Sequence, residues 1–535
     1  MTIVLFIVSL LTRLIFLYFG HHSITHDEAD YFMNSYLLAR TGTDIWGQKV
    51  FLTSGILYAT SAIPVYLGSF IFHLFDKSIL AARLPFALLN SFSPVLFYLI
   101  LKKLTNNKVF SVIAFTVFNF SPWFSYLSAQ SAFDSPISLM FYLMACYILL
   151  TKIKPLYKNL FFTFFLFLSF NSYMGIKISF PFLIFAALLI KRIYFKNKIN
   201  SINITKTFIV SLFIFACLFI LTNISPGASR FQFRLNEKLL PFNSKIISDK
   251  VVAERSITNN QEFIKSLIFN KITVTGSMFL ERYIQAYNPY FIFIKGDQHV
   301  IYGTNYFGLF YPFDLFLLIA GFYFASSVLK ANKKIAVPFF LLLIFAAIPI
   351  GIMVDTPNIS IRGYPLILPY VFFISIGIYQ ILKLALKNNK KIFVTSSLLY
   401  VFSFILFFVI FQVVIKNASA DQWHLMEKKL SEKLLTIKEK NINKKIIVYV
   451  NEPRETLLLY LFYQEKNPFK IKKSLLSKNY SIDNVFFSSL CPQEKIDNSI
   501  QILHSERCPI NNNVFKHTLF VPPENNISPG YFLLK

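Results

Sequence analysis

Stretches without any charged side chain recur along this chain and constrain its fold more than any other feature. Each is long enough to cross a bilayer as a helix. They cover residues 84–101, 109–133, 135–151, 207–229, 335–354, 363–382 and 392–415. Of the 535 residues, 55% are hydrophobic and only 15% are charged, too few ionic groups to cover soluble domains of this total size. The sequence therefore predicts an integral membrane protein.

These segments are predicted to be helices. A transmembrane β-barrel would require repeated segments of about ten residues in which apolar and polar side chains alternate, and the sequence shows no such repeat. We expect about 11 transmembrane helices. Their approximate ranges are 2–20, 84–101, 109–124, 135–151, 159–175, 177–194, 207–224, 308–329, 335–354, 364–382 and 392–414. Clusters of Lys and Arg follow alternate spans, and the positive-inside rule assigns them and the N-terminus to the cytoplasm.

The apolar stretch 50–75 contains Gly55, Pro64 and Gly68, and counting it as a span would reverse the side of every later basic loop. We therefore expect it to form helices lying on the outer leaflet. Two outer loops then remain, at about 21–83 and 225–305.

The chain after about residue 416 loses its apolar runs. An amphipathic stretch at 421–440, a strand-like segment at 446–450 and a helix-like segment at 454–465 predict a small α/β domain. The fold class expected is an all-α polytopic membrane protein, with a transmembrane domain over 1–415 and an extracytoplasmic domain over 416–535. Cys491 and Cys508, both in this tail, either form a disulfide or are two buried thiols.

The formal net charge of +27 does not indicate nucleic-acid binding, because the lysines form short clusters between apolar runs. We expect no nucleic-acid partner. The sequence also contains no Cys-x-x-Cys motif and no Cys/His cluster of the kind that predicts structural zinc.

Acidic residues are concentrated directly after the first predicted span, in the sequence His26-Asp27-Glu28-Ala29-Asp30-Tyr31. Acids at the membrane surface are often only solvated. Here the cluster is followed by the predicted surface helices and then by Arg83-Leu84-Pro85, which opens the next span.

In this order of features the chain resembles the GT-C glycosyltransferases of family 39, which include protein O-mannosyltransferases and bacterial aminoarabinose lipid A transferases. Further similarity is found at Asn288-Pro289-Tyr290-Phe291-Ile292-Phe293, at Lys295-Gly296-Asp297-Gln298-His299, and from Ile348-Pro349 to Arg362 and Pro365. The resemblance implies a GT-C fold and transfer of a sugar from a polyprenyl-phosphate donor to an acceptor outside the membrane, with inversion at the anomeric carbon.

The resemblance implies that Asp27 is the general base that takes the proton of the acceptor hydroxyl. Adjacent residues of an extended loop point in different directions, so Glu28 is expected to brace the loop or bind acceptor. Asp134 is a second candidate catalytic acid, in the outer turn before the fourth span; alternatively, it only caps a helix start. Asp27 and Asp134 are the candidate ligands if a divalent cation takes part.

Arg83, Lys177 and Arg362 are candidates for binding the donor phosphate, and the arginines are the stronger two because guanidinium groups bind phosphate bidentately. Each could instead extend to lipid headgroups. Asp297 and His299 are candidates for the cavity rim, and a structural role is the more plausible one for His299.

Three other functions remain open: a polymerase or ligase of polyprenyl-linked glycans, a transporter of lipid-linked sugars, and a scaffold without activity. The expected partners are membrane lipids, the polyprenyl-phosphate sugar, and a protein, lipid or glycan acceptor. The expected location is the plasma membrane. The sugar, the acceptor and the oligomeric state do not follow from the sequence.

Overall fold

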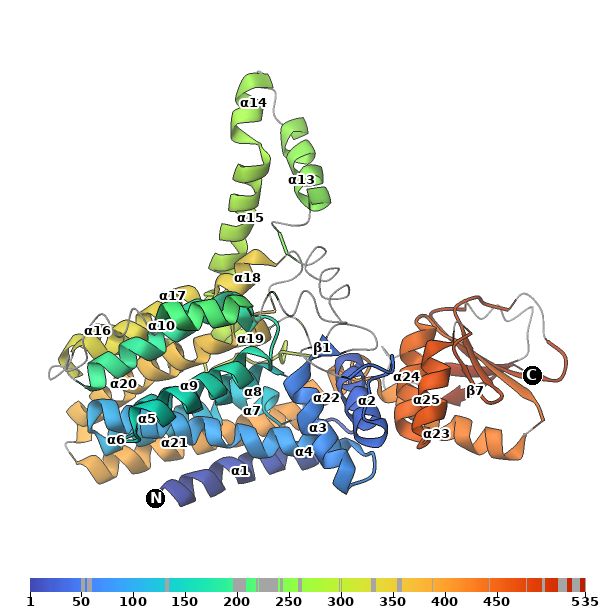
Figure 1. Ribbon diagram of the computed structural model, residues 1–535, viewed down its shortest axis with the longest axis horizontal. Helices are drawn as coiled ribbons and strands as arrows, with labels where there is room; N and C mark the ends of the chain where they lie inside the picture. Colours follow the sequence, from blue (N-terminus) through green and yellow to red (C-terminus); the bar gives the residue numbers. More distant parts are fainter. Residues whose placement is uncertain are drawn as a thin grey trace. The chain divides into compact units, whose positions relative to one another are not determined.

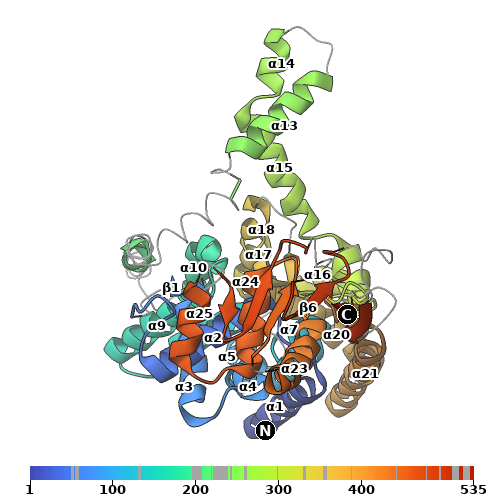
Figure 2. The ribbon, with the colours of Figure 1, turned by 90° about the vertical axis from the view of Figure 1, so that its right-hand side faces the viewer.

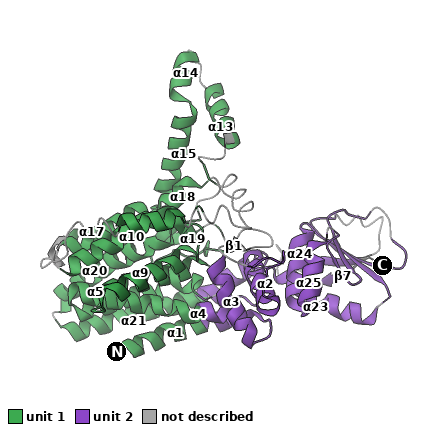
Figure 3. Ribbon diagram, viewed as in Figure 1, with its two compact units in different colours: residues 1–14, 87–128, 133–409 green, residues 15–86, 129–132, 410–535 purple. Residues whose placement is uncertain are grey.

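A computed structural model gives the fold of the chain (Figure 1). It describes residues 1–49, 53–54, 60–129, 134–195, 208–217, 220, 239–240, 244–257, 262–297, 299, 301–328, 333–353, 358–386, 388–441, 443–477, 479–492, 496–508, 517–521 and 530–534. The chain divides into two compact units (Figure 3). Unit 1 comprises Met1–Leu14, Ala87–Ser128 and Phe133–Val409; unit 2 comprises Ile15–Phe86, Ala129–Ala132 and Ile410–Lys535.

The described residues of unit 1 are mainly helical, with one isolated β-bridge between Leu239 and Met353. Of the described helices, three have one end in unit 2, namely α1 (Thr2–Phe19), α4 (Ile79–Asn90) and α21 (Asn389–Ile410), which ends there at Ile410. The α-helices that follow are α5 (Phe92–Thr105), α6 (Lys108–Phe120), α7 (Pro122–Leu127), α8 (Asp134–Leu149), α9 (Pro155–Phe170), α10 (Ile176–Tyr194), α13 (Ser244–Ile257), α14 (Glu262–Ile268), α15 (Lys271–Gln285), α16 (Asp314–Val328), α17 (Ala336–Phe345), α18 (Ile348–Ile352), α19 (Ile359–Arg362), α20 (Ile367–Leu386) and α21 (Asn389–Ile410). Short π and 3-10 turns lie at η1 (Tyr290–Lys295), η2 (Lys333–Ile335) and η3 (Tyr364–Leu366).

Four helical stretches among the described residues are long and apolar enough to cross a membrane: Thr2–Phe19, Ile79–Thr105, Tyr364–Leu386 and Asn389–Ala418. They match predicted spans. Shorter apolar helices lie within other predicted spans, at Lys108–Phe120, Asp134–Leu149, Pro155–Phe170, Phe208–Cys217, Asp314–Ala325 and Ala336–Ile352. The span predicted at 207–224 is described only over 208–217 and residue 220. The helical fold class is confirmed.

Small residues let two of the unit 1 helices approach closely. A Cβ atom on Gly321 of α16 would overlap the carbonyl oxygen of Phe373 of α20, and one on Gly377 would overlap that of Leu317. Glycines at such positions bring helix backbones together, and close packing is a main source of helix association in a membrane.

Arg13 lies midway along α1 and faces the interior of unit 1, fully buried. Its Nη2 atom donates to the carbonyl oxygen of Asn119 at 2.8 Å and to Ser125 Oγ at 3.3 Å, and its guanidinium lies 4.3 Å from the centre of the Phe124 ring. An unpaired charge in an apolar interior is costly, so these dipoles and the ring stabilise it.

Unit 2 combines the first outer segment with the C-terminal part of the chain. The segment holds α2 (His26–Thr41), the antiparallel pair β1 (Thr53–Ser54) and β2 (Thr60–Ser61), and α3 (Ala62–Leu74). Among its described residues, the stretch 50–75, expected to form surface helices, holds the β1–β2 pair and one helix of 13 residues, α3. Its length is too short to span a bilayer.

The C-terminal part of unit 2 is the α/β domain that the sequence predicts. It begins with η4 (Phe411–Ile415) and α22 (Lys416–Ala418). Its other helices are α23 (Leu425–Lys440), α24 (Pro453–Gln464) and α25 (Pro468–Leu476). Its strands are β3 (Lys445–Tyr449), β4 (Ser481–Ile482), β5 (Val485–Ser488), β6 (Ser499–His504), β7 (His517–Val521) and β8 (Tyr531–Leu534).

The six strands form one sheet in the order β4-β5-β3-β6-β8-β7 (Figure 2). Strand β3 pairs in parallel with β5 and β6, and the outer pairs are antiparallel. The central position of β3 explains its nearly continuous burial, since a parallel strand covered on both faces is apolar throughout. A disulfide joins Cys491 to Cys508, with Cα atoms 5.6 Å apart, which settles the alternative left open by the sequence.

Within unit 2, the C-terminal domain packs directly against the first outer segment. The hydroxyl of Tyr36 on α2 donates to the carbonyl oxygen of Lys466 at 2.6 Å, and Lys428 Nζ donates to that of His22 at 2.9 Å. The hydroxyl of Tyr463 accepts from the amide of Ile24 at 3.2 Å. The residues just before and within α2 are therefore fixed by residues more than 400 positions away.

Candidate active site

The acidic cluster lies at the beginning of helix α2, and a capping box fixes that beginning. Thr25 Oγ1 accepts from the amide of Glu28 at 3.2 Å, and Glu28 Oε2 accepts from the amide of Thr25 at 3.3 Å. The expectation of an extended loop at Asp27 and Glu28 is therefore wrong. Consecutive residues of a helix point about 100° apart, so the two carboxylates still face different surroundings.

Glu28 forms a buried ion pair with Arg83, at the other end of the segment. Arg83 Nε donates to Glu28 Oε1 at 2.9 Å and Nη2 donates to Glu28 Oε2 at 2.7 Å, with side-chain exposures of 1% and 0%. The same guanidinium also donates to the carbonyl oxygens of His21 at 2.6 Å and Ser23 at 2.8 Å. Arg83 thus ties the chain before α2 to the first turn of α2.

Asp27, one position before Glu28, keeps part of its carboxylate accessible, with a side-chain exposure of 19%. Its Oδ1 atom lies 3.6 Å from Nε2 of His26. Asp27 lies in the first turn of α2, where negatively charged side chains are favourable beside the positive end of the helix dipole. Asp27 therefore offers a partly accessible carboxylate at the beginning of this helix.

His21 and Trp423 form the apolar side of this region. Their rings stack in parallel at 4.1 Å, and the Arg83 guanidinium lies 5.2 Å from the Trp423 ring centre. Burial, followed by the positive charges of Arg83, Lys416 and His22, lowers the pKa of His21 well below its usual value. The His21 imidazole is therefore neutral at physiological pH.

Arg362 lies at the end of α19 in unit 1, and neighbouring residues hold this short helix in place. Asp297 Oδ2 accepts hydrogen bonds from the amide and the hydroxyl of Ser360, each at 2.9 Å, and Trp123 Nε1 donates to the Ser360 carbonyl oxygen at 2.7 Å. Asp297 is buried, and its Oδ1 also accepts from the amide of His299 at 3.1 Å. Asp297 thus positions α19.

The other candidates of unit 1 have simpler surroundings. Asp134 is buried and is the first residue of α8, as expected for a residue that stabilises a helix start. Lys177 lies in the first turn of α10, with Nζ 5.0 Å from the centre of the Phe170 ring. The His299 ring stacks on Tyr302 at 4.4 Å.

The structure thus brings Asp27, Glu28 and Arg83 together in unit 2. The candidates of unit 1 are Asp134, Lys177, Asp297, His299 and Arg362. A cation shared by Asp27 and Asp134 would need residues of both units and stays a prediction.

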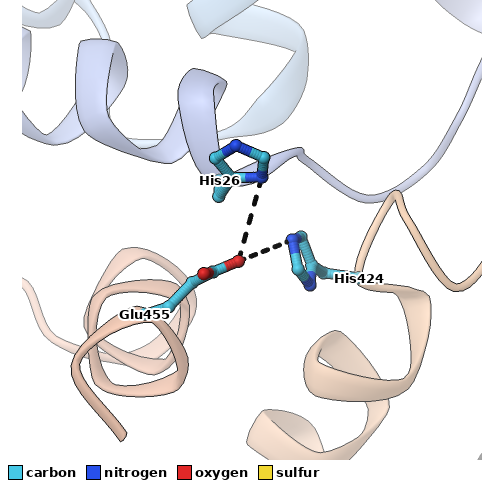
Figure 4. Close-up of side chains that lie close together, drawn as sticks. All are labelled: His26, His424 and Glu455. Atoms are coloured by element: carbon cyan, nitrogen blue, oxygen red, sulfur yellow. Dashed lines mark ion pairs between the residues drawn. The ribbon is translucent and has the colours of Figure 1, made fainter. Parts of the chain in front are cut away.

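The structure adds one group that the sequence does not predict. His26, His424 and Glu455 converge beside Asp27, on the beginnings of α2, α23 and α24 (Figure 4). Burial lowers the pKa of His424, but the neighbouring carboxylates of Glu427 and Glu455 outweigh this effect and raise the pKa to about 10. The three residues are far apart in sequence, so no spacing motif reveals them; the only local signal is His26 directly before Asp27.

Comparisons with known proteins agree with the resemblance found in the sequence. Residues 60–221 match the sequence family described as dolichyl-phosphate-mannose-protein mannosyltransferase. The matched segment includes Arg83, Asp134 and Lys177, and it ends before Asp297. No curated protein sequence matches the chain significantly.

Among solved structures, the chain is similar to ArnT from Cupriavidus metallidurans. The crystal structure bound to undecaprenyl phosphate gives a TM-score of 0.49 at 10% identity, and the apo state gives 0.42 at 10% identity. Both alignments cover 99% of this chain and 97% of the other. Similarity at this level does not establish a shared activity. The chain is an integral membrane protein, and its resemblance to the glycosyltransferases of family 39 is confirmed over residues 60–221.

Proposed function

We propose that this protein is an inverting glycosyltransferase that moves a sugar from a polyprenyl-phosphate donor to an acceptor outside the membrane. The match of residues 60–221 to a family of dolichyl-phosphate-mannose-dependent transferases is the observation that carries the proposal. In the reaction, an acceptor oxygen forms a bond to the anomeric carbon. The bond from that carbon to the phosphate oxygen breaks, and polyprenyl phosphate leaves.

Asp27 is the proposed base in this reaction. It is the partly accessible acid of the pair, and it takes the proton that the acceptor hydroxyl loses as the new bond forms. Glu28 is fully buried and its two carboxylate oxygens accept from Arg83, so it suits the bracing role. Removal of the base by substitution is expected to slow transfer by about 10²–10⁴-fold.

The donor phosphate is proposed to bind Arg362, with Lys177 as a second cation. Arg83 already donates four hydrogen bonds, two to the Glu28 carboxylate and two to backbone carbonyl oxygens. To bind phosphate, it would have to give up this buried network. Arg362 lies on a helix whose position Asp297 and Trp123 fix through Ser360. The planar guanidinium of Arg362 can bind phosphate oxygens bidentately and loses less side-chain entropy per hydrogen bond than a lysine does.

The C-terminal domain is proposed to lie outside the cytoplasm, with the N-terminus inside. The disulfide between Cys491 and Cys508 supports this orientation, because disulfides form and persist in oxidising compartments. The basic clusters between predicted spans support the same orientation. In a bacterial host the membrane is the plasma membrane, and the acceptor is a protein, a lipid or a cell-surface glycan.

Incubation of the purified protein with a panel of radiolabelled polyprenyl-phosphate sugars, with membrane extract as acceptor source, tests the proposal. We expect one donor to release free polyprenyl phosphate and to label an acceptor. Folded protein that releases none from any donor would favour a scaffold. Movement of intact donor across vesicle membranes would favour a transporter, and growth of a lipid-linked chain would favour a polymerase.

A further inference from the structure

His26, His424 and Glu455 place three metal-binding atoms around one point in unit 2 (Figure 4). Glu455 Oε1 lies 3.0 Å from His424 Nε2 and 3.9 Å from His26 Nδ1, and all three ligand atoms lie within 4.8 Å of one another. The side chains are 18–26% exposed, although the Nε2 atom of His424 is itself buried.

The separations suit a tetrahedral ion. Ligand atoms at about 2.1 Å from zinc lie about 3.4 Å apart at tetrahedral angles. The distances of 3.0 and 3.9 Å lie on either side of that value, and the two histidine nitrogens lie within 4.8 Å of each other, so the three side chains need to move closer together to hold one ion. Two imidazoles and one carboxylate are a ligand set that zinc uses where a fourth position stays open to water.

Each histidine also has a carboxylate beside its second ring nitrogen. Glu427 Oε2 lies 3.5 Å from His424 Nδ1, and Asp27 Oδ1 lies 3.6 Å from His26 Nε2. Tyr531 fixes Glu427 in turn, because its hydroxyl donates to Glu427 Oε1 at 3.2 Å. Carboxylates in this position orient metal-binding histidines and make them better ligands.

The backbone at His424 gives an independent indication that this side chain is held for a purpose. His424 adopts a left-handed conformation with φ 51° and ψ 40°, directly before α23. For a residue other than glycine this conformation is unfavourable, and such residues cluster at ligand-binding and active sites.

We propose that His26, His424 and Glu455 bind one divalent transition-metal ion, with zinc as the best match to the ligand set and a water in the open position. The ion joins the first turn of α2 to α23 and α24. Because His26 contacts Asp27, metal binding also orients the proposed base. The proposal goes beyond sugar transfer, and metal binding is measured without any donor or acceptor.

The test uses full-length, untagged protein in detergent, stripped with a chelator and titrated with zinc chloride by calorimetry at pH 8. Bound metal is counted by elemental analysis after gel filtration. Cobalt(II) serves as a second probe, because its visible spectrum reports tetrahedral coordination. The variants are His26→Gln, His424→Ala and Glu455→Gln; the matched control is His22→Ala, which removes an exposed histidine of the same segment.

We expect one zinc per chain in the wild type and in His22→Ala. Each ligand variant should weaken zinc binding at least about 100-fold, since loss of an outer carboxylate alone costs about 10–100-fold. Glu427→Gln, which removes only an outer carboxylate, should weaken zinc binding by about 10–100-fold. If His424→Ala does not fold, the nearly isosteric Glu455→Gln decides.

Two results would overturn the proposal. One is a folded, stripped wild type that takes up no zinc and gives no tetrahedral cobalt spectrum. The other is zinc binding that remains unchanged in Glu455→Gln, which would show that the metal is held elsewhere. Neither outcome depends on whether the protein transfers a sugar, so this proposal and the proposed function can fail separately.

Discussion

Replacing Glu28 with Gln tests whether the buried ion pair with Arg83 holds the first outer segment together. The substitution keeps the size of the side chain and one oxygen that can accept a hydrogen bond, but it replaces the other oxygen with an NH2 group and removes the negative charge. Arg83 is then left almost fully buried without a counter-charge, and its contacts are the Gln side chain, the carbonyl dipoles of His21 and Ser23, and the Trp423 ring. Removal of one partner from a buried pair costs about 3–5 kcal/mol.

The size of the effect follows from this cost. The remaining carbonyl contacts keep the expected loss near the lower value, about 3 kcal/mol. For a cooperative unit of about 150–250 residues each kcal/mol lowers Tm by about 2–4 °C, so Glu28→Gln should lower Tm by at least about 6 °C. Thermal unfolding of the purified protein in detergent, followed by tryptophan fluorescence, measures the shift.

Glu432→Gln is the matched control, because Glu432 is 58% exposed and lies 3.9 Å from Lys428. Its exposed ion pair is worth less than about 1 kcal/mol, so Tm should hardly change. The double variant Glu28→Leu with Arg83→Met should be more stable than Glu28→Gln, since it leaves no unpaired buried charge. A Glu28→Gln protein as stable as the control would refute this account of the pair.

Three further predictions concern other parts of the structure. Burial lowers the pKa of His21, so the contribution of His21 to the free energy of unfolding is present above about pH 6.5 and declines by about 1.4 kcal/mol per pH unit below that pH. His21→Phe should therefore reduce the fall in Tm between pH 7.5 and 5.5. An identical fall in Tm in the variant and the wild type would contradict this. Asp297→Asn should loosen α19 and weaken binding of polyprenyl phosphate through Arg362, as measured by calorimetry, whereas unchanged affinity would remove Arg362 from the phosphate site. Replacing Cys491 and Cys508 with Ser should lower the free energy of unfolding by about 3 kcal/mol. In the wild type, the number of reactive thiols should rise by two when the protein is reduced. Equal thiol counts before and after reduction would contradict the disulfide.

The sequence predicts the helical spans and the C-terminal domain because both depend on local patterns. Charge-free runs of bilayer length predict helices wherever they occur. In the tail, the expected strand at 446–450 and helix at 454–465 correspond closely to β3 and α24. Hydrophobic periodicity carries this information within a short window, so no distant contact is needed.

The local conformation at Asp27 and Glu28 was less predictable. The sequence Thr25-His26-Asp27-Glu28 contains the Thr and Glu of a capping box three residues apart, so a helix start could have been recognised there. Acidic residues directly after a predicted span instead suggested a loop. The pairing of Glu28 with Arg83, 55 positions later, depends on how the segment folds back.

The group of His26, His424 and Glu455 could not be predicted from spacing. Metal motifs are recognised when their ligands lie a few residues apart on one element. Here the ligands come from the beginnings of three helices, and His26 is 398 residues from His424 and 429 residues from Glu455. Only the packing of the C-terminal domain on α2 brings them together.

The most direct test of the account compares wild type with Asp27→Asn in the donor panel, with donor binding measured separately. The account predicts that release of polyprenyl phosphate falls by about 10²–10⁴-fold while donor affinity and Tm stay close to wild type. Turnover within a few-fold of the wild type would contradict the account, because the proposed base would then be dispensable.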